Sequence, residues 1–180
     1  MKKKLVTGAI TVTFIILLIT SFSLYQDTIQ LKTRLGNNYI HVYNTASLNT
    51  NRLYKDLQAF SDIKQIRFNY YSFQFDNITT LIRQNYPTIY NLENHFIELY
   101  QNCIEISEAI EINDNNKATQ LKNEIIENLE KGLKSLEVVQ KNGGKLYGTT
   151  TYRDSVEWYE NINKNRDKII NEIDQILKAE

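Results

Sequence analysis

The sequence predicts an all-α protein in which an N-terminal transmembrane helix is followed by an antiparallel four- or five-helix bundle. Three observations support this fold class. Residues 5–26 carry no charged side chain. Most of the remaining chain repeats apolar residues at three- and four-residue steps, the period of an amphipathic helix. Helix breakers are scarce, since Pro87 is the only proline and the chain has 6 glycines, which argues against an all-β fold.

Residues 5–24 are predicted to form a transmembrane anchor whose contact is membrane lipid. A bilayer core needs roughly 20 apolar residues as helix, and this segment contains the run ITVTFIILLI. Lysines occupy positions 2–4, so the positive-inside rule places residues 1–4 in the cytoplasm. Residues 25–180 are then a soluble, extracytoplasmic helical domain of a single-pass cell-membrane protein. A cleaved secretory signal is the alternative, because Ser21-Phe22-Ser23 has a small-x-small pattern.

Composition limits the partners of this domain. After residue 26 there are 18 basic and 21 acidic residues, a formal net charge of −3. No long run of like charge is present, so we expect no nucleic-acid partner. The lone Cys103 cannot form an internal disulfide, and the fold must therefore depend on packing.

The stretch between the anchor and residue 85 is predicted to hold two apolar helical stripes. The first continues straight out of the membrane and consists of Leu31, Leu35, Tyr39, Val42 and Ala46. The second consists of Leu53, Leu57, Phe60, Ile63, Ile66, Tyr70, Phe73 and Asn77. Aromatic residues between positions 68 and 75 also alternate with a period of two. A helix is still favoured over a strand, because the flanks keep three- and four-residue steps and no hairpin turn lies nearby.

Two long helices are predicted between residues 87 and 144. Pro87 suits the first turn of the first helix, whose stripe is Ile89, Leu92, Phe96, Leu99, Cys103, Ile106 and Ile110. Turn and cap formers at 113–116 end it. The second helix is carried by Ala118, Leu121, Ile125, Leu129, Leu133, Leu136 and Val139. It ends at Asn142-Gly143-Gly144, because glycine takes the left-handed cap conformation at little cost.

A loop over residues 145–149 and one final helix complete the predicted domain. Thr150 or Thr151 is predicted to cap that helix. Its apolar stripe is Tyr152, Val156, Tyr159, Ile162, Ile169, Ile173 and Ile176.

Residues able to carry out chemistry are few. His41 and His95 lie on separate predicted helices without a zinc motif or a Glu-x-x-His pair, so we expect no metal and two half-exposed histidines. Cys103 lies on a helix seam, where a free cysteine behaves as a small hydrophobe. Acidic pairs such as Glu105 with Glu108 lie on polar faces. The sequence therefore predicts no enzyme activity and no cofactor.

Aromatic residues are the best candidates for function. Tyrosine and tryptophan are favoured at interfaces, so Tyr71, Phe75 and Trp158 are the candidate partner contacts; the alternative is that they fill the core. We expect a non-enzymatic interaction module of the cell envelope with a protein partner. The alternative function is an extracytoplasmic ligand-sensing domain. It would act with a separate signalling subunit, because only four residues precede the anchor.

Two blocks of the chain resemble the LemA family. The first follows the anchor, has Tyr39 where tryptophan is usual, and consists of Tyr25, Ile29, Leu31, Leu35, Asn37, Tyr39, Val42 and Asn44. The second, YRDSVEWYE at residues 152–160, is similar to the family's Tyr-Asn-Asp-x-Val-x-x-Tyr-Asn. The arginine pair and proline expected after the first block are absent, as is the Phe-Pro after the second. The resemblance implies a single-pass membrane protein with an antiparallel bundle and no established enzyme activity.

Overall fold

The computed structural model describes residues 2–86, 89–144 and 151–179, and their side chains apart from those of residues 2–11 and 90. Six α-helices account for most of this part of the chain, and it contains no strand, so the all-α prediction is confirmed there. The helices are α1 (Lys2–Ala59), α2 (Phe68–Asn85), α3 (Tyr90–Glu111), α4 (Asn115–Gly143), α5 (Tyr152–Lys164) and α6 (Arg166–Lys178), with a short 3-10 helix η1 (Ile63–Gln65) between α1 and α2.

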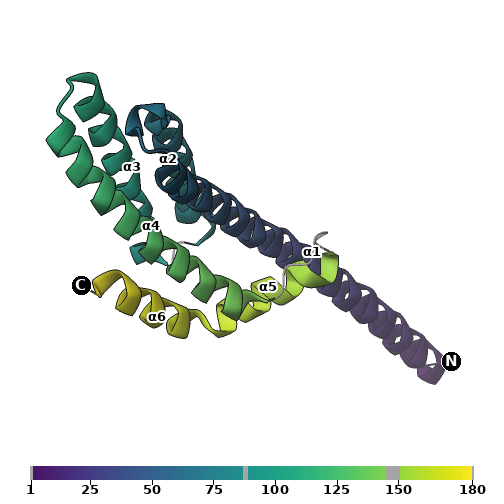
Figure 1. Cartoon of the computed structure of the whole chain (residues 1–180). Helices are drawn as coiled ribbons and strands as arrows, with labels where there is room; N and C mark the ends of the chain where they lie inside the picture. Colours follow the sequence, from purple (N-terminus) through teal and green to yellow (C-terminus); the bar gives the residue numbers. More distant parts are fainter. Residues whose placement is uncertain (1, 87–88, 145–150, 180) are drawn as a thin grey trace.

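Helix α1 runs without a break for 58 residues. Its first part extends away from the rest of the molecule (Figure 1), and residues 12–28 are exposed. From Gly36 onward α1 packs against other helices. We call the described residues 36–86, 89–144 and 151–179 the helical body. The turn formers Gly36-Asn37-Asn38 lie within α1 and do not end it.

The helical body consists of helices that pack on their neighbours in the chain and on α1. Helices α2 and α3, and then α3 and α4, are joined by short connections and pack side by side (Figure 1). Helix α1 contacts α2, α4 and α5, whereas α6 contacts α4 and α3. The largest fully buried side chains are Trp158, Phe68, Phe75, Phe96, Leu53, Ile78, Ile82, Leu99, Ile106, Ile125, Leu129 and Ile169.

The predicted turn between α3 and α4, the predicted end of α4 and both seams are confirmed. Every member of the two predicted stripes is buried except Ile110 and Leu133, which are half-buried. Asn113 adopts the left-handed conformation (φ 57°) that an asparagine tolerates. The Asp114 carboxylate then caps α4 by accepting the backbone N–H of Lys117 at 3.0 Å. Gly144 ends α4 with a φ of 136°. Pro87 lies outside the described residues.

The predicted phase of α2 is wrong, and the reason is a break that the apolar stripe did not reveal. Helix α1 ends at Ala59, and the Asp62 carboxylate caps η1 by accepting the Lys64 backbone N–H at 3.0 Å. This irregular segment resets the helical phase before α2 begins at Phe68. The predicted core positions Tyr70 and Phe73 are therefore exposed. The buried face is formed by Phe68, Tyr71, Ser72, Phe75, Ile78, Thr79 and Ile82.

The single final helix predicted from residue 152 is two helices that meet at Asn165. Trp158 and Ile162 of α5 are buried, as are Ile169 and Ile173 of α6. Because α5 packs mainly on α1 and α6 mainly on α4, one straight helix cannot follow both. Thr151 caps α5 in a capping box with Asp154, which confirms one of the two predicted caps. The predicted loop at 145–149 lies outside the described residues.

Candidate functional site

The three aromatic residues predicted to contact a partner are in the core, which corrects that prediction. Tyr71, Phe75 and Trp158 are 5%, 0% and 1% exposed. The Tyr71 hydroxyl donates to the Asp56 carboxylate at 2.5 Å, and burial together with this bond raises the pKa of Tyr71. The packed side chains offer no surface to a second molecule.

Each of these buried rings packs on a specific neighbour. Phe75 lies 5.9 Å from Phe96, and the Trp158 ring lies 5.6 Å from Tyr43, measured between centroids. A Cβ at Gly143 would come within 2.8 Å of the Trp158 ring, so glycine at this position lets α4 approach α5 closely. The aromatic pairs therefore hold the core together.

A different set of apolar side chains is exposed at the end of the helical body farthest from the N-terminus. The exposed fractions are 37% for Phe60, 45% for Tyr70, 67% for Phe73 and 73% for Ile112. We call these four residues the distal cluster. Phe60 lies at the α1–α2 corner, and Ile112 lies at the α3–α4 corner. Tyr70 and Phe73 lie on the first turns of α2. The two corners are at the same end of the molecule (Figure 1).

Local interactions fix the two corners that carry the distal cluster. The Lys64 ammonium donates to the Asn113 side-chain oxygen at 3.1 Å and so joins one corner to the other. Asp62 caps η1 within the first corner, and Asp114 caps α4, which leaves the second. The Tyr70 ring packs edge-on against the buried Tyr71 at 5.3 Å between centroids. The distal cluster is therefore presented on a defined surface.

The sequence held a signal for only part of the distal cluster. Ile112 follows the end of the α3 stripe and directly precedes the turn formers at 113–116, so its exposure could have been anticipated. The predicted stripe places Tyr70 and Phe73 on the wrong face, because it runs through the break before α2.

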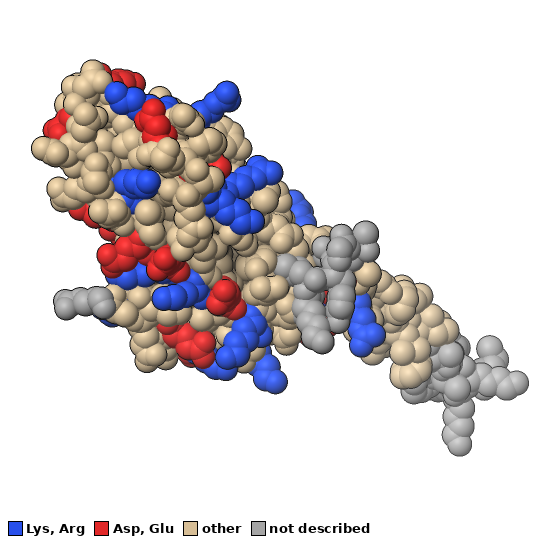
Figure 2. Space-filling model, viewed as in Figure 1, with Lys and Arg blue, Asp and Glu red and all other residues tan. Residues whose placement is uncertain are grey.

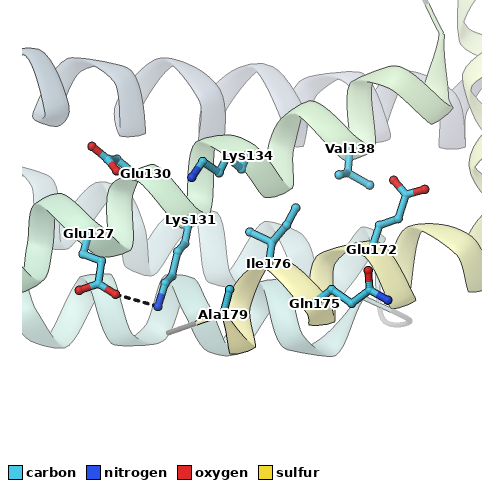
Figure 3. A pocket seen from close by; sticks show the side chains of 9 residues that line it. All are labelled: Glu127, Glu130, Lys131, Lys134, Val138, Glu172, Gln175, Ile176 and Ala179. Carbon is cyan, nitrogen blue, oxygen red and sulfur yellow. Dashed lines mark ion pairs between the residues drawn. The ribbon is translucent and has the colours of Figure 1, made fainter.

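A groove between α4 and α6 is the second surface feature. It has a volume of about 710 Å³, and its lining residues are Glu127, Glu130, Lys131, Lys134, Val138, Glu172, Gln175, Ile176 and Ala179. Figure 3 shows charged side chains of α4 along one side and Ile176 pointing between the two helices. Lys131 pairs with Glu127 at 2.8 Å, and the Tyr54 hydroxyl donates to Glu130 at 2.9 Å. The groove thus combines an apolar floor with charges of both signs.

Histidine 95 is buried, although the sequence predicted a half-exposed side chain. It is 5% exposed and lies on α3. One ring nitrogen is hydrogen-bonded to the backbone of Asn128, and Nε2 has no hydrogen-bond partner. A Cβ at Gly132 would lie 2.9 Å from Nε2, so this glycine makes room for the ring. Desolvation lowers the pKa of His95 to about 4; His41 is exposed.

Cys103 is on the α3 seam, as predicted. It is fully buried, and burial raises the pKa of its thiol to about 12. The predicted solvation of Glu105 and Glu108 is confirmed, since both are exposed. Within the described ranges, no group of three or more His, Cys, Asp or Glu side chains is placed to hold a metal ion.

Helix α5 packs on the part of α1 that follows the N-terminal apolar segment. The Ser155 hydroxyl donates to the Asn37 side chain at 2.5 Å, and a Cβ at Gly36 would lie only 1.7 Å from the Ser155 carbonyl oxygen. Lys32 pairs with Glu160 at 2.7 Å. The two blocks that resemble the LemA family, residues 25–44 and 152–160, are thus in contact with each other.

Helix α1 also contains one stretch long and apolar enough to cross a membrane. It is the only such stretch in the part of the chain that the structure describes. Residues 12–24 are exposed, which differs from an apolar helix in the core of a soluble protein. A signal sequence near an N-terminus would have the same properties. Charges of both signs are interspersed on the visible face of the helical body, and the protruding part of α1 is largely uncharged (Figure 2).

Comparisons with protein-family models, curated proteins and solved structures found no match for this chain. The resemblance to the LemA family stays a prediction.

Proposed function

We propose that the chain is a single-pass membrane protein whose antiparallel helical bundle is a non-enzymatic interaction module. Residues 5–24 form a helix of about 30 Å, which matches the hydrocarbon thickness of a bilayer. The lysines before this segment favour a cytoplasmic N-terminus and a helical body on the outer side of the cell membrane. A single-pass membrane protein with an antiparallel bundle is also what the LemA resemblance implies.

The observation that carries the proposal is the distal cluster. Large apolar residues gathered on a surface mark sites of protein interaction, and aromatic side chains are enriched in such sites. In the proposed orientation, α1 runs about 50 Å from Leu24 to Ala59. The distal cluster then stands clear of the anchoring membrane and faces a protein partner.

The chemical state of the buried groups supports a non-enzymatic role. A general base must be able to reach its substrate and must have a pKa near the working pH. His95 is buried with its pKa lowered to about 4, and Cys103 is buried with its pKa raised to about 12. Neither group is available to a substrate at neutral pH.

Photocrosslinking in intact cells tests the module. A photoreactive amino acid replaces Phe73 or Ile112, and Tyr152, which is 54% exposed on α5, serves as the control position. We expect Phe73 and Ile112 to capture the same protein and Tyr152 not to capture it. No adduct, or the same adducts from all three positions, would overturn the proposal.

Loss-of-contact variants supply a second measurement. The double variant Phe73→Ser, Ile112→Ser should abolish co-purification of the captured protein. Exposed substitutions typically change the free energy of unfolding by less than about 0.5 kcal/mol each, so thermal unfolding should be nearly unchanged. Carbonate extraction of membranes tests the anchor separately, because an integral protein stays in the pellet.

The groove between α4 and α6 favours a second candidate function, a ligand-sensing domain that acts with a separate signalling subunit. Its volume is within the range of small-molecule sites, and its mixed charges suit zwitterions such as amino acids. Thermal unfolding of the full chain in micelles with a panel of amino acids tests this function. A stabilising ligand whose effect is lost in Ile176→Trp, which fills the groove, would support it; no shift with any of them would reject it.

A further inference from the structure

An apolar stripe on α1 leaves the helical body and is exposed as far as Leu31, whereas Leu35 at its upper end is half-buried. Leu24 and Leu31 are 65% and 56% exposed. With Thr28 and Leu35 they repeat at steps of four, three and four residues. We call Leu17, Leu24, Thr28, Leu31 and Leu35 the proximal stripe.

The proximal stripe is the continuation of a seam that is buried farther along the same helix. Within the helical body, Val42, Ala46 and Leu53 take the same side of α1 and are 3%, 0% and 0% exposed. Leu35 and Val42 are seven residues apart, as are Leu24 and Leu31, so the spacing is that of a helix–helix seam. Because α1 is unbroken, the uncovered part has the geometry of the covered part.

Helix α5 does not cover the proximal stripe. Gly36 faces α5, since its Cβ would meet Ser155. At about 100° per residue, Leu31 lies about 140° around α1 from Gly36. Around these residues α1 is therefore packed on the side of Gly36 and open on the side of Leu31.

Residue types within the apolar segment differ between the two sides of α1. The hydroxyl residues Thr20, Ser21 and Thr28 lie within about 60° of Leu24 around the helix axis. The bulky residues Ile15, Leu18, Ile19 and Phe22 lie about 120° or more from it. Helices associate in lipid through small and hydroxyl residues, which allow close approach and hydrogen bonds. The side of the proximal stripe is thus suited to another helix, and the opposite side to lipid chains.

The helical body restricts what can occupy the stripe. On the same side of α1 but farther from the proposed membrane, Val42 and Ala46 face residues of α2, α3 and α4, among them Tyr86 and Leu136. In a parallel pair of copies joined through the stripe, each body would occupy the space of the other. The open length from Leu24 to Leu31 is about 10 Å, because Leu35 is already half-buried. A helix that emerges from the bilayer and ends within about two turns fits this space.

We propose that the proximal stripe binds the transmembrane helix of a second membrane protein. The inference rests on the proposed function in one respect, that residues 5–24 span a membrane. Asp27 lies beside the stripe at its membrane edge, about 60° from Leu24. Exposed Arg34 lies on the same side of the stripe seven residues farther on, so a partner helix would meet an acidic side chain at the membrane edge and a basic one about two turns later.

Crosslinking of the full chain in intact cells tests this contact. A photoreactive amino acid replaces Leu24 or Leu31, and the controls carry it at Phe22 or Gln26, on the other side of α1. Mass spectrometry identifies the crosslinked peptide. We expect Leu24 and Leu31 to give adducts with a transmembrane segment of one other protein, and the controls to give none above background.

Three results would overturn the inference. They are adducts between two copies of this chain, adducts with lipid alone, and equal adducts from both sides of α1. Carbonate extraction of the same cells separates this failure from failure of the proposed function. A chain that stays in the membrane but gives one of these three results refutes only the helix contact, whereas an extracted chain refutes the anchor. Leu31→Ser with the probe at Leu24 should reduce the adduct without changing thermal unfolding, because Leu31 is exposed.

Discussion

His95 lies in an environment very different from that of a free imidazole in water. Its ring lies in the core near Gly132 and Thr50. The Thr50 and Ser135 hydroxyl oxygens, like His95 Nε2, are buried without a hydrogen-bond partner. The nearby Lys131 adds a repulsive charge to the desolvation that lowers the His95 pKa. The sequence could not predict this burial, because it depends on a glycine of another helix that leaves space for the ring.

The lowered pKa of His95 makes the stability of the fold depend on pH. The unfolded chain binds the proton near pH 6.5, and the folded chain binds it only near pH 4. The stabilisation from the neutral ring is therefore complete above pH 6.5 and is lost as the pH falls from 6.5 to about 4. At 1.36 kcal/mol per pH unit, the loss reaches about 3 kcal/mol.

Urea unfolding of the full chain in micelles between pH 7 and pH 4 measures this loss. Carboxylates titrate in the same range, so the informative quantity is the difference between wild type and His95→Gln. We expect the variant to lose less stability on acidification, while the exposed control His41→Gln follows wild type. Parallel curves for wild type and His95→Gln would contradict the prediction.

At the scale of helices, the sequence predicts an element well where its signals are local. The C-terminal end of α3 and both ends of α4 lie next to Asn, Asp and Gly residues whose capping needs no distant partner, and both seams are long. The break between α1 and α2 contains neither proline nor glycine, and only the phase of the following helix reveals it. The same break turns Tyr70 and Phe73 of the distal cluster to the exposed face of α2. The break at Asn165 likewise depends on the positions of α1 and α4, on which α5 and α6 pack. The sequences of α5 and α6 carry no information on those positions.

The contact between α1 and α5 reverses the effect on stability that replacing a helical glycine by alanine usually has. Alanine is favoured over glycine by up to about 1 kcal/mol inside a helix, so Gly36→Ala would stabilise an isolated α1. In the folded chain its Cβ would lie 1.7 Å from the Ser155 carbonyl oxygen. We expect a net destabilisation of about 1–3 kcal/mol from overpacking.

Trp158 supplies the measurement, because it is the only tryptophan, is buried, and lies on α5. Its fluorescence during urea unfolding should show an earlier transition for Gly36→Ala than for wild type. Gln30→Ala, an exposed change on the same helix, should leave the midpoint unchanged. A higher midpoint for Gly36→Ala would show that α5 does not pack on α1 as described.

At the scale of the whole molecule, the continuous α1 sets the height of the distal cluster above the proposed membrane. A fluorophore on Phe73→Cys should transfer energy weakly to acceptors in the lipid headgroups, and one on Gln26→Cys strongly. Cys103 should not be labelled, because it is buried and its thiol pKa is raised to about 12. Similar transfer from both positions would mean that the body lies against the bilayer.

Helix α1 is continuous from its proposed membrane segment into the helical body. The number of residues between the two therefore fixes the direction in which the body points around the helix axis. One residue inserted between positions 26 and 32 would turn everything beyond it by about 100° and preserve every contact within each half. Seven inserted residues would nearly restore the original direction and raise the far end by about 10 Å. Such insertions would separate the effect of orientation from the effect of height.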